Sequence, residues 1–476
     1  MDNSYRETDY EPVMRRSPRR ARATDESDSA EWPRRVNVGA DDEVMREEEV
    51  EQPSDLKPAP VEKSEGKVLR RGHLFGYVGL LLFTVVLFLR PYQYSEALIN
   101  IQFPLFIAIA TLIIFIPAQL GLEGTLTARP REVNLLLLML LMSVLSVPLA
   151  YDPNVAFQSF KDFGKFAIIF IVLVNVVRTE RRLRQMLYLA LAIAYILSII
   201  ALNDYRLGDL TVEGYRVKGS IAHGMLEDPN DLAAYLVTIL PIAVALGLSA
   251  RGAVRKIIYG VCAVLCACTI IITFSRGGFL GLMAVMLTLV WKLGRRHRLA
   301  AAASAAFALL LIIFLAPGNY WLRLASIFIP SLDTLGSATA RSNLLKQSII
   351  VALRHPLFGI GMGNFPIVSV NEHVTHNAYT QVAAETGLIA LAAYVMFIIT
   401  PLRRLGRIER ELFNEVKRER RFYYLAIGLQ ASLVGYMVSS FFISVAYYPI
   451  IYYLVGYAIC LRRIYESARA ENKFQV

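Results

Sequence analysis

The sequence predicts an all-α, polytopic membrane protein, and its composition and the arrangement of its apolar residues both support this class. Of the 476 residues, 55% are hydrophobic and 19% are charged, whereas soluble domains usually have about 45–50% apolar and about 25% charged residues. The apolar residues also occur in long runs, at 75–89, 104–120, 133–149 and 299–316. A membrane-spanning helix needs roughly 20 mostly apolar residues, so runs of this length indicate spans.

The first segment, residues 1–71, is predicted to be a disordered cytoplasmic tail because it is rich in charged residues, Ser and Pro and poor in apolar ones. A basic block at Arg15–Arg22 precedes an acidic block at Asp41–Glu51. We expect a solvated tail; the alternative is an arm that docks on a partner protein or on anionic lipid.

A single membrane domain, residues 72–465, is predicted to follow, with residues 466–476 as a cytoplasmic C-terminal tail. We expect about twelve spans, because about twelve apolar segments are each nearly as long as a bilayer crossing requires. They fall near 73–91, 102–121, 133–150, 160–177, 183–202, 230–249, 256–274, 277–293, 299–316, 383–401, 422–442 and 446–461.

Loop charge predicts the orientation. With twelve spans, alternate connections carry the clustered Arg and Lys residues and share one side, which the positive-inside rule assigns to the cytoplasm. Both termini are then cytoplasmic, and the net charge of +11 needs no nucleic acid to explain it. The basic connections contain residues 129–131, 178–184, 251–256, 295–298, 403–421 and 462–463.

Two long connections lie on the opposite face, at 203–229 and 317–382. Within the longer one, residues 338–353 place apolar side chains at a period of about 3.6, which predicts an amphipathic helix. Ser337 or Thr339 is expected to cap its start and Pro356 to follow its end. We expect this helix to lie along the membrane surface.

Polar residues that could carry chemistry cluster on the same outer face. Arg276 lies in a tight Ser-Arg-Gly-Gly turn between two apolar helices, where an arginine is costly unless it is paired or reaches into water. A snorkelling arginine is the alternative, although a positive charge outside opposes the orientation rule. The turn glycines would let a ligand or backbone come close. The other clusters contain Arg216 and Asn230, Arg341, and His376, Asn377 and Glu385.

His376 is the leading candidate for a general base. It follows Thr375, which we expect to cap the next helix, so the imidazole would lie in the first turn and be kept neutral by the helix dipole. The alternatives are a structural histidine, or His373 or His223 as the base. No metal-ligand spacing occurs in these segments, and the glycine-rich stretch 359–364 lacks the Gly-Lys-Ser/Thr ending of a phosphate loop, so we expect a tight turn there.

These segments, in this order, resemble the O-antigen ligase and polymerase superfamily over residues 75–461. The likeness is strongest at His376-Asn-Ala-Tyr-Thr-Gln-Val-Ala-Ala-Glu385-Thr-Gly387. It includes Phe274-Ser-Arg276-Gly-Gly and Arg341 before His355-Pro-Leu-Phe-Gly-Ile-Gly361, and also Gly219 through Asp228-Pro-Asn230. The long N-terminal tail departs from the family, as does Ile389-Ala390 where a later glycine is often seen.

The resemblance implies a C-type glycosyltransferase-like fold with a large periplasmic loop in the bacterial inner (cytoplasmic) membrane. It implies transfer of a glycan from undecaprenyl diphosphate to an acceptor hydroxyl on a glycan or lipid-glycan at the periplasmic face, with no metal or other cofactor. By position, His376 resembles the base. Arg216, Arg276 and Arg341 resemble the diphosphate-binding arginines, with Asn377, Glu385 and Asn230 in support.

Several functions remain open at this point. Polymerases and ligases share these motifs, and a polymerase is slightly favoured. A lipid-linked glycan flippase or transporter would carry its functional charges near the bilayer midplane. A non-catalytic scaffold of an envelope polysaccharide machine is supported best by the charged tail. Partners expected besides donor and acceptor are membrane lipid and other polysaccharide-assembly proteins, but no nucleic acid.

Overall fold

The computed structural model describes residues 72–94, 103–211, 216–217, 226–295 and 337–473, with short pieces at 298–299, 303 and 306. All of these residues belong to one compact unit, Ser64–Val476. The predicted tail 1–71, almost all of the predicted span 299–316, and Gly219 and His223 lie outside the described residues. Within the described part, every regular element is helical and the only extended pairing is an isolated bridge, so the all-α prediction is confirmed there.

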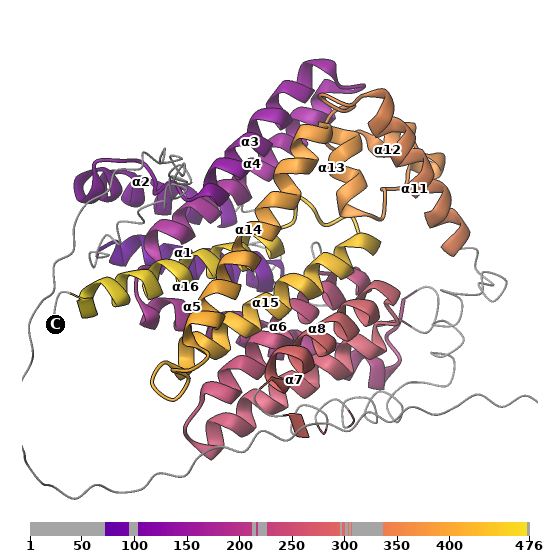
Figure 1. Cartoon of the computed structure of the whole chain (residues 1–476). Helices are drawn as coiled ribbons and strands as arrows, with labels where there is room; N and C mark the ends of the chain where they lie inside the picture. Colours follow the sequence, from indigo (N-terminus) through magenta and orange to yellow (C-terminus); the bar gives the residue numbers. More distant parts are fainter. Residues whose placement is uncertain are drawn as a thin grey trace, which may run out of the picture. The chain divides into compact units, whose positions relative to one another are not determined.

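Eight helices in the described part are long and apolar enough to cross a membrane, and each overlaps a predicted span. Three further helices, α1 (Leu74–Leu89), α4 (Pro153–Val176) and α16 (Pro449–Lys473), also coincide with predicted spans, but α1 has only 16 residues. The count of twelve stays a prediction. The eight are α2 (Phe103–Glu123), α3 with its short extension (Arg131–Leu149), α5 (Glu180–Leu207), α6 (Pro229–Ser249), α7 (Ala253–Ile272), α8 (Arg276–Gly294), α14 (Leu388–Leu412) and α15 (Arg420–Ser439) (Figure 1).

The predicted amphipathic helix is present as α11 (Ser337–Arg354), followed by the short helices α12 (Phe365–Val368) and α13 (Ala378–Thr386). The predicted span 383–401 has the wrong start, because Gly387 breaks the chain between α13 and α14. Gly387 has a φ of 91°, and a Cβ there would lie 2.2 Å from the carbonyl oxygen of Leu357. Only glycine fits both conditions, so the apolar helix starts at Leu388.

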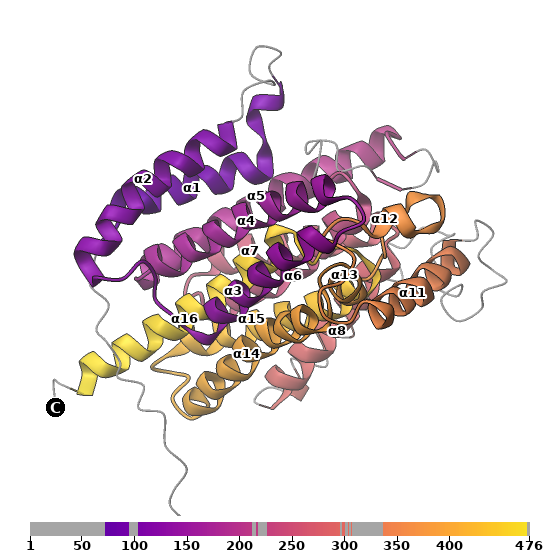
Figure 2. The same ribbon diagram turned by 90° about the horizontal axis from the view of Figure 1, so that it is seen from above.

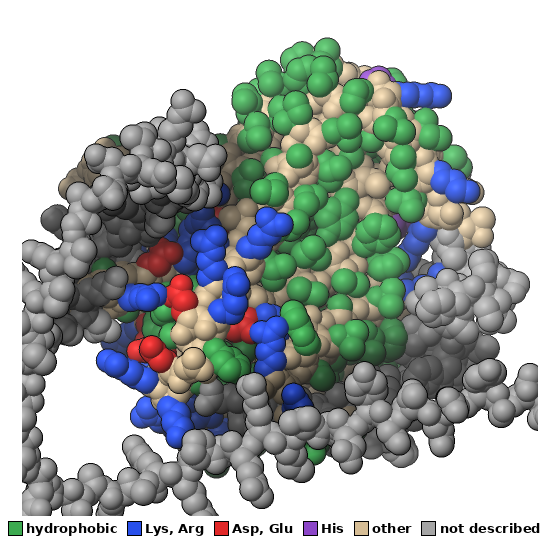
Figure 3. Space-filling model, in the orientation of Figure 1, with side chains coloured by type: hydrophobic (Ala, Val, Ile, Leu, Met, Phe, Trp, Pro, Cys, Tyr) green, Lys and Arg blue, Asp and Glu red, His purple; other side chains and the backbone are tan. Residues whose placement is uncertain are grey.

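The arginine-rich loops meet at one end of the helices, where charged side chains gather around the end of α14 (Figure 3). Ion pairs and a carbonyl contact join helix ends that lie next to these loops and far apart in sequence, as the prediction of a shared side requires. The bonds link Arg421 to Glu180 at 3.0 Å, Arg462 to Glu132 at 3.0 Å, Lys292 to Glu409 at 2.5 Å, and Arg420 to the carbonyl oxygen of Leu248 at 2.8 Å.

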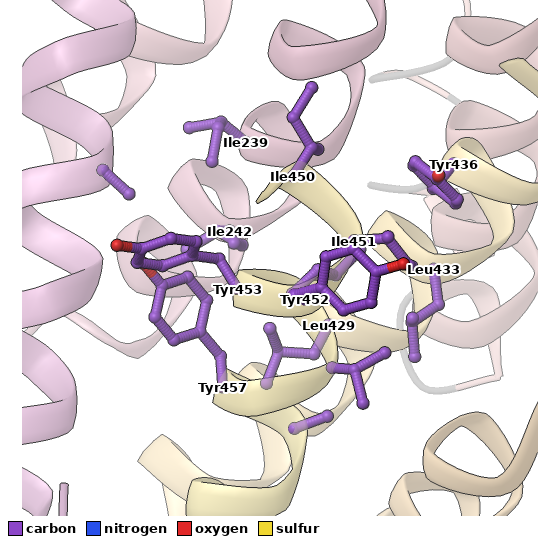
Figure 4. Packing of buried hydrophobic residues seen from close by; sticks show 14 of the residues in the cluster. Ile239, Ile242, Leu429, Leu433, Tyr436, Ile450, Ile451, Tyr452, Tyr453 and Tyr457 are labelled. Atoms are coloured by element: carbon purple, nitrogen blue, oxygen red, sulfur yellow. The ribbon is translucent and has the colours of Figure 1, made fainter. Parts of the chain in front are cut away.

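The tyrosine-rich helix α16 lies in the interior and packs against α4, α14 and α15 (Figure 2). Its Tyr452 and Tyr453 are buried among apolar side chains of α6 and α15 (Figure 4). Their hydroxyls are satisfied, since Tyr452 donates to the carbonyl of Ala446 at 2.8 Å and Tyr453 lies 2.8 Å from the hydroxyl of Thr84. Buried tyrosines of this kind contribute a large apolar contact area, and the hydrogen bonds of their hydroxyl groups orient the rings.

Glycines bring α6, α8 and α15 into close contact. A Cβ on Gly435 of α15 would lie 2.5 Å from Val285 of α8 and 2.8 Å from Val237 of α6. Small residues at helix crossings allow backbones to approach and maximise van der Waals contact inside a membrane. The same three helices begin or end beside the polar cluster described below. Their close packing therefore fixes the positions of the residues in that cluster.

We expect Gly435→Val to destabilise the protein, because the added methyl groups overlap side chains of two neighbouring helices. Overpacking of this kind costs about 1–3 kcal/mol. Thermal unfolding of purified protein in detergent measures the change. Gly260→Val is the matched control, since a Cβ on Gly260 in α7 meets no atom within 4 Å. Equal unfolding temperatures for the two variants would contradict the packing argument.

Candidate functional site

A buried asparagine joins two of the predicted polar clusters at the end of the helices opposite the arginine-rich loops. The Oδ1 atom of Asn230 accepts one hydrogen bond from Arg216 Nη2 at 2.9 Å and another from Ser275 Oγ at 2.8 Å. The loop before α6 and the turn between α7 and α8 are therefore tied together. Arg276 follows Ser275 directly, so the network also fixes the first residue of α8.

Local sequence explains why Asn230 lies at this point. Asp228 caps α6 by accepting from the backbone N–H of Asn230 at 2.6 Å, and Pro229 occupies the first helical position, where a missing N–H costs nothing. The same Asp-Pro-Asn triplet opens α4, where Asp152 accepts from the N–H of Asn154 at 2.8 Å. The Asn154 side chain is exposed, whereas that of Asn230 is buried. Of these two helices, only α6 uses the capping motif to place an amide inside the protein.

Arg216 is held mainly by protein groups. Its side chain is buried, and besides the bond to Asn230 its Nε donates to the carbonyl oxygen of Thr273 at 3.1 Å. Thr273 ends α7, and a cation near a helix C-terminus is stabilised by the exposed carbonyl dipoles. The guanidinium thus has a fixed position and a compensated charge.

The turn between α7 and α8 is strained and tightly packed. Phe274 has a φ of 52°, a left-handed conformation that is rare for a bulky residue. Ser275 then caps α8 by accepting from the N–H of Gly278 at 3.1 Å. A Cβ would lie 2.8 Å from Phe442 at Gly277, and 2.6 Å from Ala233 at Gly278. These glycines therefore serve the close approach of neighbouring helices.

His376 precedes α13 and is not part of it. Asn377 is the capping residue, with Oδ1 accepting from the N–H groups of Tyr379 at 2.9 Å and Thr380 at 3.0 Å. The prediction that Thr375 caps this helix is wrong, because the Thr375 hydroxyl instead donates to the carbonyl of Asn377 at 2.9 Å. His376 adopts a φ of 51°, a left-handed conformation that histidine tolerates better than most residues.

The His376 imidazole is neutral at physiological pH. Its pKa is lowered to about 4, mainly by burial and also by the nearby Arg341 guanidinium, whereas the Asp228 carboxylate acts to raise it. Burial favours the uncharged ring, because a buried charge loses its hydration. The neutral state was predicted, but its cause is burial and Arg341. The same interactions bring Arg341 of α11 and Asp228 of α6 into the surroundings of His376.

Two buried polar atoms beside His376 have no hydrogen-bond partner in the described part of the chain. These are Nδ2 of Asn377 and Oε1 of Gln381, which are one helical turn apart on α13. Buried polar groups are normally paired. One amide therefore presents a donor and the other an acceptor to a ligand.

A groove of about 970 Å³ is lined by Gln381 and by residues of α1, α2 and α4. Its walls are mostly apolar, with Arg90 and Lys165 among the few charged residues that line it. Tyr448 lines the groove as well, and burial raises its pKa to about 12, with Asp231 and Asp228 adding to the rise. Tyr448 therefore connects the groove to the carboxylates at the start of α6.

Glu385 lies apart from this cluster. It is about 12 Å along the axis of α13 from Asn377. Burial raises its pKa to about 7, opposed by the backbone N–H groups of Gly363 and Phe365 and by the Tyr447 hydroxyl. Its carbonyl accepts from the N–H of Gly361 at 3.0 Å. The tight turn expected at 359–364 is present, and its glycines at 359, 361 and 363 have φ values of 68°, 99° and 74°.

The structure thus brings Arg216, Asn230 and Ser275 into one network and places Arg341 near His376. Asp228, Ser275 and Gln381 lie in the polar segments that the sequence analysis singled out, but it gave none of them a role in the site. The capping position of Asp228 was readable from Asp-Pro-Asn, but its proximity to His376 depends on how α6 and α13 pack. Among the described residues, no three His, Cys, Asp or Glu side chains gather to hold a metal ion.

Residues 261–395 match the family model described as O-antigen ligase. The matched segment covers a little more than a quarter of the chain and includes the Ser275–Gly278 turn, Arg341 and the stretch from His376 to Gly387. Arg216 and Asn230 precede it. The predicted resemblance to the O-antigen ligase and polymerase superfamily is therefore confirmed. No curated protein matches the chain.

We expect Asn230→Ala to destabilise the protein by about 1–3 kcal/mol, because it leaves a buried guanidinium and a buried hydroxyl without their shared acceptor. Thermal unfolding in detergent measures the loss. Asn154→Ala, in the same triplet but exposed, should unfold like the parent protein. Two variants that unfold alike would show that the amide of Asn230 does not hold the network together.

Proposed function

Because residues 261–395 match the family model described as O-antigen ligase, we propose that the chain belongs to the O-antigen ligase and polymerase superfamily and is a membrane glycosyltransferase. It moves a glycan from undecaprenyl diphosphate to an acceptor hydroxyl during assembly of a surface polysaccharide, without a metal ion. The observation that carries the proposal is a neutral, half-buried His376 beside Arg341 and Asp228. Asp228 also caps α6 at Asn230, the residue that holds Arg216.

His376 acts as the general base. As the acceptor oxygen bonds to the anomeric carbon of the donor sugar, the bond from that carbon to the diphosphate breaks and the hydroxyl proton passes to an imidazole nitrogen. A neutral imidazole accepts this proton, and the nearby Asp228 carboxylate stabilises the imidazolium that forms. A placed base of this kind contributes about 10²–10⁴-fold to the rate.

The arginines stabilise the leaving diphosphate. Guanidinium groups bind phosphate oxygens in a bidentate manner and remain charged at all accessible pH values. Arg276 and Arg341 contact the diphosphate, and Arg216, held by Asn230 and Thr273, adds a fixed positive charge behind them. Charges that are already oriented before the reaction lower the barrier without reorganisation.

Asn377 and Gln381 orient the sugar, and the groove holds the lipid. The free donor on Asn377 and the free acceptor on Gln381 match the hydroxyl groups of a glycan. The apolar walls contributed by α1, α2 and α4 suit a polyprenyl chain. Glu385 supports the site indirectly, by holding the turn that follows α11.

The placement of the charges favours an enzyme over a flippase or transporter. Arg216, Asn230 and Ser275 lie where α6 and α8 begin and α7 ends, whereas a transporter binds its substrate near the bilayer midplane. A non-catalytic scaffold has no need of a neutral histidine next to an arginine. We place the protein in the bacterial inner membrane, with the site on the periplasmic face and donor, acceptor, lipid and other assembly proteins as partners.

Within the superfamily, we favour a polymerase slightly over a ligase. Deletion of the protein followed by analysis of surface glycans separates the two activities. Loss of polymer length identifies a polymerase, because repeat units are no longer joined. Accumulation of full-length polymer on the lipid carrier identifies a ligase, because the polymer is made but not transferred.

We expect His376→Ala to lower glycan transfer by about 10²–10⁴-fold, because the acceptor loses its base. Arg276→Lys should also impair transfer strongly, since an ammonium cannot replace the guanidinium fork. Purified protein in detergent and a lipid-linked glycan provide the assay, with folding checked by thermal unfolding. His355→Ala, an exposed histidine, is the control. A folded His376→Ala protein with most of its activity would refute the proposed base.

The pH dependence gives an independent test of Arg341. His376 works as the neutral ring, so kcat/KM falls as the pH drops through its pKa of about 4. Removal of the Arg341 charge favours imidazolium, so Arg341→Gln should shift this acidic limb to higher pH. Lys346→Gln, an exposed cation on the same helix, should leave the limb in place. If the acidic limb of the Arg341→Gln profile stays in place, Arg341 does not lower the pKa of His376.

A further inference from the structure

A second polar cavity lies at the opposite end of the helices, among the arginine-rich loops. It encloses about 90 Å³ between the start of α5, the α6–α7 loop, the start of α7 and the start of α15. Four arginines line it, namely Arg184, Arg251, Arg255 and Arg421, with Glu180 as the accompanying carboxylate. None of these residues belongs to the proposed transfer site.

The positive charge of this cavity exceeds what its carboxylate can balance. Glu180 lies 3.0 Å from Arg421 and 3.6 Å from Arg184, so it already serves two of the four cations. Arg251 and Arg255 are exposed at the rim of the cavity, and neither has a carboxylate within ion-pair distance in the part of the chain that the structure describes. Like charges held around a small cavity repel one another, and an anion inside it would relieve the repulsion.

The start of α7 adds to the positive potential. Gly252 provides no side-chain cap, and the first turn of the helix contains no acidic residue. It contains Arg255 and Lys256 instead, although cations are unfavourable at the positive end of a helix dipole. The backbone N–H groups there suit a phosphate.

The surroundings indicate that the anion belongs to a lipid. The first turns of α7, which contribute Arg255 and Tyr259 to the cavity, also expose Val254, Ile257 and Ile258, which are 69%, 64% and 59% accessible. Leu246 and Leu425 line the cavity together with the arginines, so its wall is partly apolar. A ligand that fits has a phosphate head and long apolar chains.

We propose that this cavity binds the phosphate group of an anionic phospholipid, whose acyl chains lie along the exposed face of α7. The arginines come from α5, the α6–α7 loop, α7 and α15, so one phosphate would link three helices that lie far apart in sequence. The positive-inside rule assigns this end to the cytoplasmic leaflet. The inference is independent of the proposed transfer reaction.

The experiment measures binding of phosphatidylglycerol to the purified full-length protein in detergent, by native mass spectrometry and by the rise in unfolding temperature. Phosphatidylcholine is the zwitterionic comparison. Arg251→Ala combined with Arg255→Ala should weaken phosphatidylglycerol binding roughly 25-fold, as expected for two lost contacts of about fivefold each. The control is Arg403→Ala combined with Arg407→Ala, two exposed arginines of α14 at the same end. This pair removes equal charge and should bind the lipid like the parent.

Three outcomes would overturn the proposal. The first is equal weakening in the two double variants, which would reduce the effect to overall charge. The second is binding of inorganic phosphate as tight as that of phosphatidylglycerol, which would make free phosphate the ligand. The third is lipid binding by a chain that lacks residues 2–65 but not by the full-length chain. This result would mean that the acidic segment Asp41–Glu51, and not a lipid, occupies the cavity in the full-length protein.

Discussion

The polar end of this protein depends on one buried amide. Asn230 accepts from Arg216 and from Ser275 with the same oxygen, so three segments separated by up to 59 positions in sequence share a single atom. A guanidinium buried among helix ends is tolerated only when its donors are satisfied. The capping carboxylate of Asp228 places this amide, and the carboxylate also acts on His376. The arrangement of the arginines and the electrostatic surroundings of the base therefore have a common origin.

Much of the architecture could be predicted because the bilayer imposes simple rules. Helix lengths follow from hydrocarbon thickness, which is why the eight apolar helices fall on predicted spans. Loop charge correctly grouped connections that ion pairs join, such as those of Arg421 and Glu180. The period of α11 was readable because its apolar residues repeat locally. Each of these signals belongs to one segment and needs no knowledge of its neighbours.

The features that the sequence concealed depend on contacts between segments. The break at Gly387 was not predicted, because the need for glycine there comes from a φ of 91° and from the nearby carbonyl of Leu357, neither of which the sequence displays. The cap of α13 was assigned to Thr375 since threonine is a good capping residue, but its hydroxyl is engaged with the Asn377 carbonyl. Motif order identified His376, Arg276 and Arg341 as candidates, whereas the groove beyond Gln381 arises from packing of α1, α2 and α4.

The break at Gly387 also affects how α11 and α13 are joined. Three backbone hydrogen bonds join the end of α13 and the start of α14 to the turn after α11, from Ile360 to Ala384, from Gly361 to Glu385 and from Leu388 to Pro356. Helix α11 carries Arg341, and α13 follows His376. These bonds couple the two helices through the backbone rather than through side chains. The spacing between base and arginine therefore rests on main-chain contacts that most side-chain substitutions would leave in place.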